Sequence, residues 1–389
     1  MNPNQFGFTK RRGTKDALIE FCNKTMLSLN NGNCVLGVFI DFSKAFDTID
    51  HSILISKLQH YNFSPNTINW FKSYLTDRTQ LVQIENMYSG LRKLACGVPQ
   101  GSILGPKLFI LYVNDLAQYS QCFSPILYAD DTNLFYESKN LNLDINIIND
   151  SLNLVFQWCS ANRLTLNLDK TNYMIISCYQ QNFQFNQNIS INSTILQKVN
   201  CLKFLGIIID DHLSWKPHIR SVRNKLRPST GLISQVSSFL PFKTLIKLYY
   251  ALIHSRLNYC IESWGNALPT NILPLRKIQN KVLRTIFNKP SGSELMYKKA
   301  GILTLENLYK LRLGELAFLS FHQSPQPVAA YPTRSSALSL SLPPSVTQIG
   351  HRRVDYQSTS YWNDLPVYIR QIDNKNHFRL ALRQHLISL

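Results

Sequence analysis

Two adjacent aspartates, Asp130 and Asp131, interrupt an apolar stretch that runs from Ile126 to Phe135. The apolar residues on either side predict two buried strands of a β-hairpin, with the aspartates at its bend. Ionised carboxylates at the edge of a buried sheet are costly unless a cation offsets their charge. The pair therefore predicts a divalent metal site at the bend of this hairpin.

A second apolar stretch, from Cys34 to Ile40, predicts another buried strand and ends abruptly at Asp41. Three carboxylates at the ends of two strands can share one metal cluster. Their oxygen atoms suit Mg²⁺, which is a hard ion. A cap on a turn is the alternative role for Asp41.

The excess of positive charge lies entirely in the second part of the chain. Residues 1–150 carry 13 Lys and Arg against 13 Asp and Glu, whereas residues 151–389 carry 28 against 10, which accounts for the net charge of +18. A neutral part with clustered aspartates, joined to a strongly basic part, indicates a metal-dependent active site beside a surface that binds a polyanion. A basic surface that serves only solubility is the alternative.

Composition indicates a packed protein, because 44% of the 389 residues are hydrophobic. No apolar stretch approaches the roughly 18 residues that a membrane span needs, and the first residues lack the apolar core of a signal peptide. We therefore expect an intracellular protein with no membrane partner. The eight cysteines form no Cys-x-x-Cys pair, which favours mostly buried, reduced thiols over a zinc module or a disulfide framework.

Helices and strands are expected to alternate before residue 210, which is typical of an α+β fold. Apolar spacing predicts helices at residues 15–30, 53–58 (capped by Asp50), 65–75, 106–116 and 143–162. Besides the stretches already described, strands are expected in a hairpin at 80–97 and at 164–168, 173–177 and 204–209. From Pro217 onward, the pattern predicts helices with one apolar and one cationic face.

Three motifs follow one another along the chain: Phe39 to Asp47, Gly97 to Pro106, and Tyr128 to Asp131. In this order and spacing they resemble the reverse transcriptases of non-LTR retrotransposons. Two further motifs, Asn167 to Thr171 and Cys201 to Gly206, support the resemblance. It extends over nearly the whole chain, from Gln5-Phe6-Gly7-Phe8 onward.

The resemblance implies a right-hand polymerase fold of the α+β class, with a palm at residues 31–212 and a helical, basic thumb at residues 213–322. Residues 1–30 would be a remnant of the fingers, since related proteins carry more sequence before this point. A Pro- and Ser-rich linker at 323–348 and a small C-terminal segment at 349–389 complete the predicted division. We therefore expect an N-terminally truncated fragment of a larger polyprotein, with incomplete fingers.

By resemblance, Asp41, Asp130 and Asp131 are catalytic residues that bind two Mg²⁺ ions during nucleotidyl transfer to a primer 3′-hydroxyl. Asp41 and Asp130 are expected to be the more direct ligands. Lys170 is expected to protonate the pyrophosphate leaving group, and a solvated lysine in a turn is the alternative.

The resemblance also assigns nucleotide contacts to Phe42, Phe46, Gln100 and Gly101. Phe46 would lie against the sugar, where its ring excludes a 2′-hydroxyl and favours deoxynucleotides, and a core aromatic is the alternative. Gln100 lies in a glycine-rich loop that lets backbone approach a ligand closely, and a plain turn is the alternative.

Contacts with primer and template are assigned to a hairpin and to basic helices. The residues concerned are Phe204, Leu205, Gly206, Arg220 and Arg223. The two arginines would bind phosphates without reading sequence. Phe204 and Leu205 as core residues, and the arginines as a solvated face, are the alternatives. A further matching segment, Tyr361 to Pro366, is expected to be structural.

Together these residues predict an RNA-directed DNA polymerase that uses an RNA template, a DNA primer and deoxynucleoside triphosphates. A nuclear location is implied by the resemblance. One alternative function is a catalytically disabled fragment that still binds nucleic acid, because incomplete fingers cannot hold a nucleotide. A maturase or telomerase-like polymerase, which shares the palm, is the other alternative.

Overall fold

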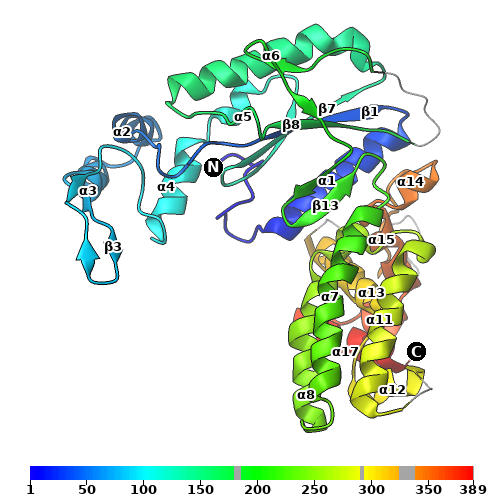
Figure 1. Ribbon diagram of the computed structural model, residues 1–389. Helices are drawn as coiled ribbons and strands as arrows, with labels where there is room; N and C mark the ends of the chain where they lie inside the picture. The colour runs from blue at the N-terminus through cyan, green and yellow to red at the C-terminus, as the bar shows by residue number, and fades with distance from the viewer. Residues whose placement is uncertain (179–184, 290–292, 324–337, 389) are drawn as a thin grey trace. The chain divides into compact units, whose positions relative to one another are not determined.

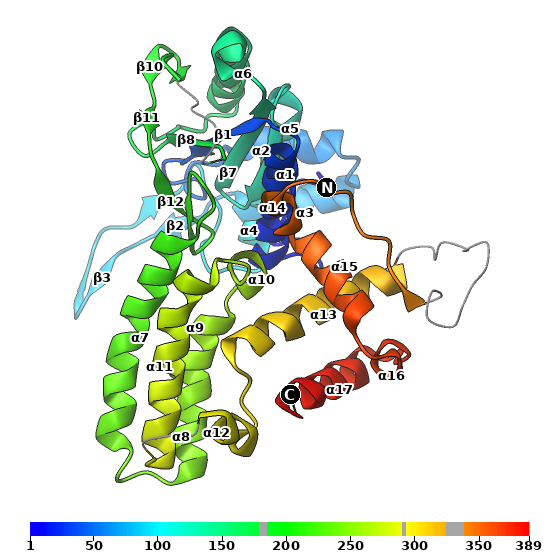
Figure 2. The ribbon, with the colours of Figure 1, turned by 90° about the vertical axis from the view of Figure 1, so that its right-hand side faces the viewer.

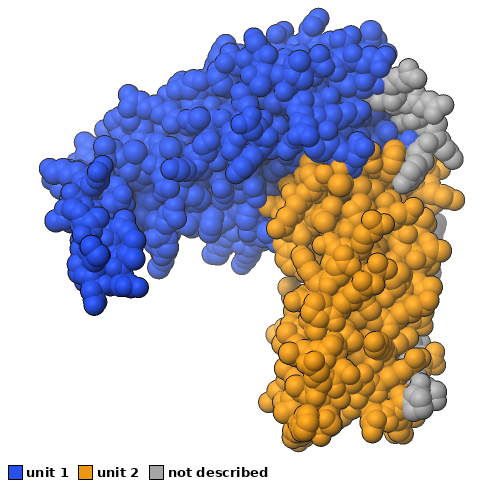
Figure 3. All heavy atoms as spheres, viewed as in Figure 1, with its two compact units in different colours: residues 1–17, 33–200 blue, residues 18–32, 201–389 orange. Residues whose placement is uncertain are grey.

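The computed structural model describes residues 1–178, 185–289, 293–323 and 338–388. The chain divides into two compact units, coloured blue and orange in Figure 3. Unit 1 consists of residues 1–17 and 33–200, and unit 2 of residues 18–32 and 201–389.

A five-stranded sheet with the strand order β11-β8-β1-β7-β6 forms the centre of unit 1. Its strands are β1 (Cys34–Ile40), β6 (Ser124–Tyr128), β7 (Asp131–Ser138), β8 (Asn172–Ile176) and β11 (Gln197–Lys198). Central β1 pairs antiparallel with both β7 and β8. Because β1 is buried on both faces, its sequence is a continuous apolar run rather than an alternating one.

Helices and short hairpins complete unit 1. The helices are α2 (His51–His60), α3 (Pro65–Leu75), α4 (Leu104–Tyr112), α5 (Leu116–Tyr119) and α6 (Leu141–Ala161). The short strands are β2 (Thr79–Gln80), β3 (Gln83–Ile84), β4 (Met87–Tyr88), β5 (Arg92–Lys93), β9 (Ser190–Ile191) and β10 (Thr194–Ile195). Figure 1 shows α6 along one face of the sheet, where Leu152 and Val155 join Leu36, Val38 and Leu134 in one hydrophobic core.

Unit 2 is mostly helical, and its described residues contain one hairpin, β12 (Cys201–Phe204) and β13 (Ile207–Asp210). Its longer helices are α1 (Thr14–Asn30, which starts in unit 1), α7 (Lys216–Val236), α8 (Phe242–Tyr249), α11 (Pro269–Phe287), α12 (Ser293–Ala300), α13 (Leu305–Gln323), α15 (Val354–Asp364) and α17 (Lys375–Ser388). Its short helices are α9 (Ser255–Asn258), α10 (Ile261–Trp264), α14 (Gln348–His351), α16 (Val367–Arg370) and the π-helix η1 (Tyr250–His254). Helices α7 and α11 pack side by side (Figures 1 and 2).

Two asparagines of α1 bind a segment that lies more than three hundred residues further along the chain. The side-chain oxygen of Asn30 accepts hydrogen bonds from the backbone N–H groups of Val346 and Thr347, at 3.2 and 3.1 Å. The side-chain oxygen of Asn23 accepts from the N–H of Val354, at 2.8 Å. Residues 18–32 therefore belong to the same packed unit as α14 and α15.

The matching segment Tyr361 to Pro366 lies in the core of unit 2. Trp362 is fully buried, and its indole N–H donates to the carbonyl oxygen of Leu338 at 2.8 Å. Asn363 bonds both the N–H and the carbonyl oxygen of Leu340. These contacts agree with a structural role for the segment. Much of the predicted linker, residues 324–337, lies outside the described residues.

The prediction that most of the cysteines are buried is wrong, because only half of them are. All eight cysteines are free, but only Cys22, Cys34, Cys159 and Cys260 are buried. No helix in the described part of the chain is both long enough and apolar enough to cross a membrane.

Candidate active site

The strand register brings Asp41 and Asp131 to the same end of the sheet. Ile40 of β1 pairs with Thr132 of β7, so Asp41 lies opposite Asp131 one step beyond the last pair. Strands β6 and β7 pair Tyr128 with Asp131, which leaves Ala129 and Asp130 as a tight two-residue turn. Ala129 is buried and has a φ of +55°, in the left-handed region. The hairpin predicted around the two aspartates is therefore confirmed.

The electrostatics of Asp131 reflect this crowding of carboxylates. Partial desolvation, followed by the negative charges of Asp130 and Asp41, raises the pKa of the Asp131 carboxyl. A like charge nearby disfavours the ionised form, and a bound cation reverses that effect. Asp131 therefore lies within electrostatic reach of both other aspartates.

The donor set fits Mg²⁺. In the described ranges, no group of three or more His, Cys, Asp or Glu side chains is arranged so as to hold a metal ion, so the shared three-carboxylate cluster stays a prediction. However, Mg²⁺ at phosphoryl-transfer sites is typically bound by one or two carboxylates together with substrate phosphates. Asp41 and Asp131, which the register sets opposite each other, can supply those two carboxylates, and both Asp131 and Asp130 are exposed. That Asp130 rather than Asp131 is the more direct ligand stays a prediction.

The turn from Asn167 to Thr171 is bound to the backbone of Asp41. The N–H of Asn167 donates to the carbonyl oxygen of Asp41 at 2.8 Å. The hydroxyl of Thr171, which is fully buried, accepts from the N–H of Asp41 at 3.3 Å and donates to the carbonyl oxygen of Asn167 at 2.8 Å. Lys170 is exposed on this turn. The fold therefore places Lys170 on a segment that is anchored at Asp41.

The glycine-rich loop is anchored to the segment that follows β1. Gly97 has a φ of +83°, and a Cβ there would come within 2.8 Å of the carbonyl oxygen of Asp47, so the position requires glycine. The side-chain amide of Gln100 donates to Asp47 at 2.8 Å. Gln100 and Gly101, whose φ is +79°, are both exposed. The loop thus holds Gln100 at the surface through Asp47, a residue to which sequence reasoning assigned no chemistry.

A pocket of about 670 Å³ opens beside this loop. Its lining includes the basic side chains of Lys44, Arg78 and Lys93. His51 also lines it and makes a 2.7 Å hydrogen bond from its ring Nε2 to the carbonyl oxygen of Gly97. Basic groups around a hollow beside a Gly-rich loop suit an anionic ligand.

The two predicted aromatic contacts differ in accessibility. Phe42 is buried and forms an isolated bridge with Leu166, so its side chain belongs to the core. Phe46 is half-buried, with its ring centroid 4.7 Å from that of Phe109. Its carbonyl oxygen accepts a hydrogen bond from the N–H of Val98 at 2.9 Å. The structure therefore brings Phe46 next to the Gln100 loop.

The remaining predicted residues belong to unit 2. Phe204 is buried against Phe21, with ring centroids 5.3 Å apart, which agrees with the core alternative for this side chain. Leu205 and Gly206 form the turn of the β12–β13 hairpin, with φ values of +46° and +85°. Their left-handed backbone therefore forms a tight, type I′-like bend.

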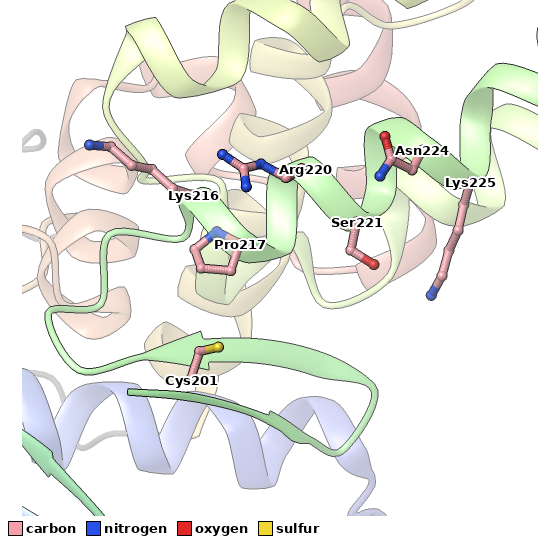
Figure 4. A pocket seen from close by; sticks show the side chains of 7 residues that line it. All are labelled: Cys201, Lys216, Pro217, Arg220, Ser221, Asn224 and Lys225. Carbon is pink, nitrogen blue, oxygen red and sulfur yellow. The ribbon is translucent and has the colours of Figure 1, made fainter. Parts of the chain in front are cut away.

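Arg220 and Arg223 lie on α7, next to shallow pockets. A pocket of about 660 Å³ lies between α7 and β12, where Cys201 points toward Pro217 and Ser221 (Figure 4). Arg220, with Lys216 and Lys225, contributes positive charge to its lining. Arg223 and Arg220 also line a smaller hollow of about 240 Å³ next to α11. The predicted cationic helix face is therefore present on α7.

Sequence reasoning missed two residues that contact the site. Thr171 directly follows Lys170 in the sequence. Its role is visible only in the structure, where its buried hydroxyl accepts a hydrogen bond from the N–H of Asp41. Gln5 was part of the resemblance but received no role, although its side chain bonds the turn that carries the aspartates. A buried glutamine between an asparagine and a phenylalanine has no periodic signal that could have identified it.

Comparison with known proteins places this arrangement in a family. Residues 1–209 match the reverse transcriptase (RNA-dependent DNA polymerase) family. The chain is 26% identical over 300 residues to an RNA-directed DNA polymerase from the mobile element jockey of Drosophila melanogaster, a match that covers 74% of this chain and 32% of the relative. It is 28% identical over 300 residues to a probable RNA-directed DNA polymerase from transposon BS of the same species, covering 74% and 33%.

Among solved structures, a telomerase from Candida albicans in complex with a fragment of telomeric RNA has a TM-score of 0.45 and 12% identity, covering 77% of this chain and 55% of that one. The chain spans about a third of the length of the curated relatives it matches. Because the family match covers more than half of the chain and includes every motif from Asp41 to Gly206, this protein belongs to the reverse transcriptase family, with relatives among the polymerases of non-LTR retrotransposons.

Proposed function

We propose that this chain carries the polymerase centre of a retroelement reverse transcriptase, which adds deoxynucleotides to a DNA primer on an RNA template. In this proposal, unit 1 contributes the palm, and α7 and α11 of unit 2 contribute the thumb. The observation that carries the proposal is the register that sets Asp41 opposite Asp131 at the ends of β1 and β7. Carboxylates at neighbouring strand ends can hold the metal ions that two-metal nucleotidyl transfer uses.

The carboxylates of Asp41, Asp130 and Asp131 would hold the metal ions. Mg²⁺, when bound, would lower the pKa of the primer 3′-hydroxyl and offset charge on the departing pyrophosphate. Partial desolvation and the charges of Asp130 and Asp41 raise the pKa of Asp131, and a bound cation would offset this crowding of negative charge. Oxygen-only ligands and the absence of a thiol from the cluster match the preference of Mg²⁺.

The neighbouring residues would orient the nucleotide. Gln100, held by Asp47, would contact the base or the template, and the left-handed Gly101 lets the backbone come close. Phe46 would bound the sugar site, because its ring is fixed against Phe109 and backs onto the Gln100 loop. Lys170, anchored through the Asn167 turn, would donate a proton to pyrophosphate.

The nucleic acid would be held by charge rather than by base contacts. The basic pocket beside Gln100 and the cationic face of α7 suit phosphodiester groups, which every sequence presents alike. A polymerase that moves along a duplex needs such contacts. A nuclear location, as the resemblance implies, is also a proposal, and a fluorescent fusion of the chain would test it by microscopy.

Primer extension tests the proposal. The full chain is incubated with an RNA template annealed to a DNA primer, Mg²⁺ and deoxynucleoside triphosphates, beside the double variant Asp130→Asn/Asp131→Asn. We expect the parent to extend the primer and the variant to lose extension while binding the hybrid as tightly as the parent. Equal extension by both proteins would refute the role of the aspartates.

A non-catalytic nucleic-acid-binding fragment is the second candidate, and the basic surplus after residue 150 favours it. The same experiment separates the two. Salt-sensitive hybrid binding without extension by the parent, under Mg²⁺ or Mn²⁺, would support the binding fragment and reject the polymerase.

A further inference from the structure

The segment Asn4–Gly7 lies against strand β6, at the edge of the sheet in unit 1. The N–H of Phe6 donates to the carbonyl oxygen of Leu127 at 2.8 Å, and the N–H of Leu127 donates to the carbonyl oxygen of Asn4 at 2.9 Å. Gln5 and Leu127 form a parallel bridge. The segment therefore extends the sheet beside the strand that leads into the aspartate turn.

Gln5 connects this segment to the turn itself. Its side chain is only 1% exposed. Its Oε1 accepts hydrogen bonds from the N–H of Gly7 at 2.8 Å and from the N–H of Ala129 at 3.1 Å. Because two N–H groups converge on this atom, the amide orientation is defined, and its Nε2 makes no hydrogen bond to any described residue.

Gly7 allows the close approach that this contact needs. A Cβ at residue 7 would lie 2.4 Å from the backbone nitrogen of Ala129, a distance that no packed side chain adopts. The carbonyl oxygens of Gln5 and Gly7 also accept from the hydroxyl of Thr9, at 3.2 and 3.1 Å. The glycine and the glutamine thus act together on one point, the backbone of Ala129.

Ala129 is strained, and the strain lies next to the carboxylates. A non-glycine residue at a φ of +55° costs of the order of 1 kcal/mol and persists only where its surroundings hold it. The Oε1 of Gln5 is a contact that does so, because it binds the N–H of the strained residue directly. Without it, that N–H would be buried and unpaired, and the turn would relax.

We propose that Gln5 is a positioning residue for the catalytic aspartates: together with Gly7, it holds Ala129 in the left-handed conformation that presents Asp130 and Asp131 beside Asp41. Gln5 touches neither metal nor substrate in this account. It acts through the backbone of Ala129. The proposal rests on the proposed polymerase function for its consequence on turnover, but not for its structural content.

The test compares three variants of the full chain. Gln5→Met keeps the shape and removes the acceptor, whereas Gln5→Glu keeps the acceptor and in its protonated form reproduces the amide. The matched control is Leu152→Ala in α6, which destabilises the same unit from a fully buried position in the core. Four quantities report on the site: hydrogen exchange of the Ala129 amide, the Kd for Mn²⁺, and kcat and KM in primer extension. The Tm of each variant reports on its stability.

For Gln5→Met, we expect exchange at Ala129 to accelerate about tenfold, since one hydrogen bond is lost. Mn²⁺ should bind about tenfold more weakly, and kcat should fall roughly 10- to 100-fold with little change in the KM for nucleotide. Leu152→Ala should lower Tm at least as much and leave these four quantities near the parent values. For Gln5→Glu, kcat relative to the parent should recover as pH falls and the introduced carboxyl becomes protonated.

Parent-like exchange at Ala129 and parent-like Mn²⁺ affinity in Gln5→Met would overturn the proposal, whatever its activity. Equal changes in Gln5→Met and Leu152→Ala would also overturn it, because they would indicate general loosening of unit 1. If the parent chain does not extend primers, the proposed function fails, and the exchange and Mn²⁺ measurements still decide the role of Gln5.

Discussion

The hydroxyl of Tyr259 donates a hydrogen bond to the carbonyl oxygen of Leu205 at 2.8 Å. This contact supports the turn of the β12–β13 hairpin from behind, since the ring of Tyr259 also lies where a side chain on Gly206 would have to fit. Both turn residues are left-handed, and one of them is not glycine. The bend therefore depends on its sequence more than an ordinary loop does.

Opposite effects are expected from two substitutions in this bend. Gly206→Ala should lower the free energy of unfolding by about 1–2 kcal/mol, because the φ of +85° is unfavourable and the new Cβ would lie 3.1 Å from the Tyr259 ring. Leu205→Asn should be neutral or stabilising by a few tenths of a kcal/mol, since Asn-Gly is the preferred type I′ pair. Urea denaturation of both variants measures the difference, and equal destabilisation would contradict the turn assignment.

A pH-dependent stabilisation is expected from Asp131→Asn. The pKa of Asp131 is raised above its ordinary value of 3.8, so the folded chain binds this proton more tightly than the unfolded chain does. Ionisation of Asp131 therefore lowers the free energy of unfolding as pH rises from the pKa of this carboxyl in the unfolded chain to its higher pKa in the folded chain. Removing its charge should raise Tm by about 1–2 °C at neutral pH and have no effect in acid, where the parent carboxyl is already neutral.

Thermal melts of the parent and of Asp131→Asn, in a chelator and at several pH values, measure whether the substitution raises or lowers Tm. Added Mg²⁺ should then stabilise the parent more than Asp131→Asn, because only the parent retains the full set of carboxylates. A variant that is less stable than the parent at neutral pH without metal would contradict the expected repulsion.

Thr171→Val should weaken both the fold and catalysis. The substitution keeps the shape and removes the hydroxyl that bonds Asp41 and Asn167. We expect a loss of about 1–2 kcal/mol in the free energy of unfolding, and a fall of about tenfold in kcat as Asp41 loses its support. Thr171→Ser retains the hydroxyl and serves as the control, so a similar kcat for both variants would rule out the hydrogen bonds as the cause.

Phe46→Val should relax discrimination against ribonucleotides. If the ring bounds the sugar site, a smaller side chain leaves room for a 2′-hydroxyl, and the ratio of ribonucleotide to deoxynucleotide incorporation should rise about tenfold or more. Single-nucleotide incorporation kinetics measure the ratio. Phe46→Tyr retains a ring next to Phe109 and should keep the parent ratio. An unchanged ratio in Phe46→Val would assign the ring to the core alone.

Arg220→Gln should weaken hybrid binding in a way that depends on salt. Loss of one phosphate contact is expected to lower the slope of log affinity against log salt by about 0.9. The control is Lys24→Gln on α1, because the charge of Lys24 is already paired with Glu20 at 3.0 Å. Fluorescence anisotropy over a range of salt concentrations gives the slope for the parent and for each variant. Equal slopes for the parent and Arg220→Gln would contradict a phosphate contact.

Local patterns predicted much of unit 1 because its signals lie within single segments. The helix expected at residues 65–75 and the strand at 34–40 have those bounds in α3 and β1. Asp50 caps α2 as expected, accepting from the N–H of Ile53 at 2.9 Å. In each case an apolar period and a capping or breaking residue occur together, so the segment specifies its own ends.

Predictions failed where distant partners decide the structure. The strand expected at 164–168 is only an isolated bridge between Leu166 and Phe42, because no ladder continues beside it. The strand expected at 204–209 is interrupted by the Leu205–Gly206 turn, since an apolar run did not reveal two left-handed residues. The short strands β9, β10 and β11 were not expected either. Strand β11 pairs with β8, which lies earlier in the chain. Strands β9 and β10 pair with each other across Asn192 and Ser193, two left-handed residues that the local sequence did not reveal.

The same limit applies to the active site. The aspartates could be found from sequence, because charge next to an apolar run is a local signal. That these aspartates share one place was also expected, but the register that sets Asp41 opposite Asp131 was not. The support from Thr171 and Gln5 could not be found either, because each contact joins segments that are far apart in sequence. Hydrogen bonds to backbone N–H groups leave no periodic trace in the residues that make them.

The hydrogen bonds between α1 and residues 346–354 have a consequence for synthesis on the ribosome. The Asn30 oxygen and the Thr347 hydroxyl are 2.9 Å apart in the fold and 317 residues apart in the chain. At the usual rates of translation, about 5–20 residues per second, residues 18–30 emerge roughly 15 to 60 s before the backbone that they bind has been made. During that interval the side-chain oxygens of Asn23 and Asn30 lack the N–H groups of Val354, Val346 and Thr347 that they bind in the finished protein. The hydrogen bonds that join α1 to the rest of unit 2 at residues 346–354 are therefore among the last contacts of this unit to form.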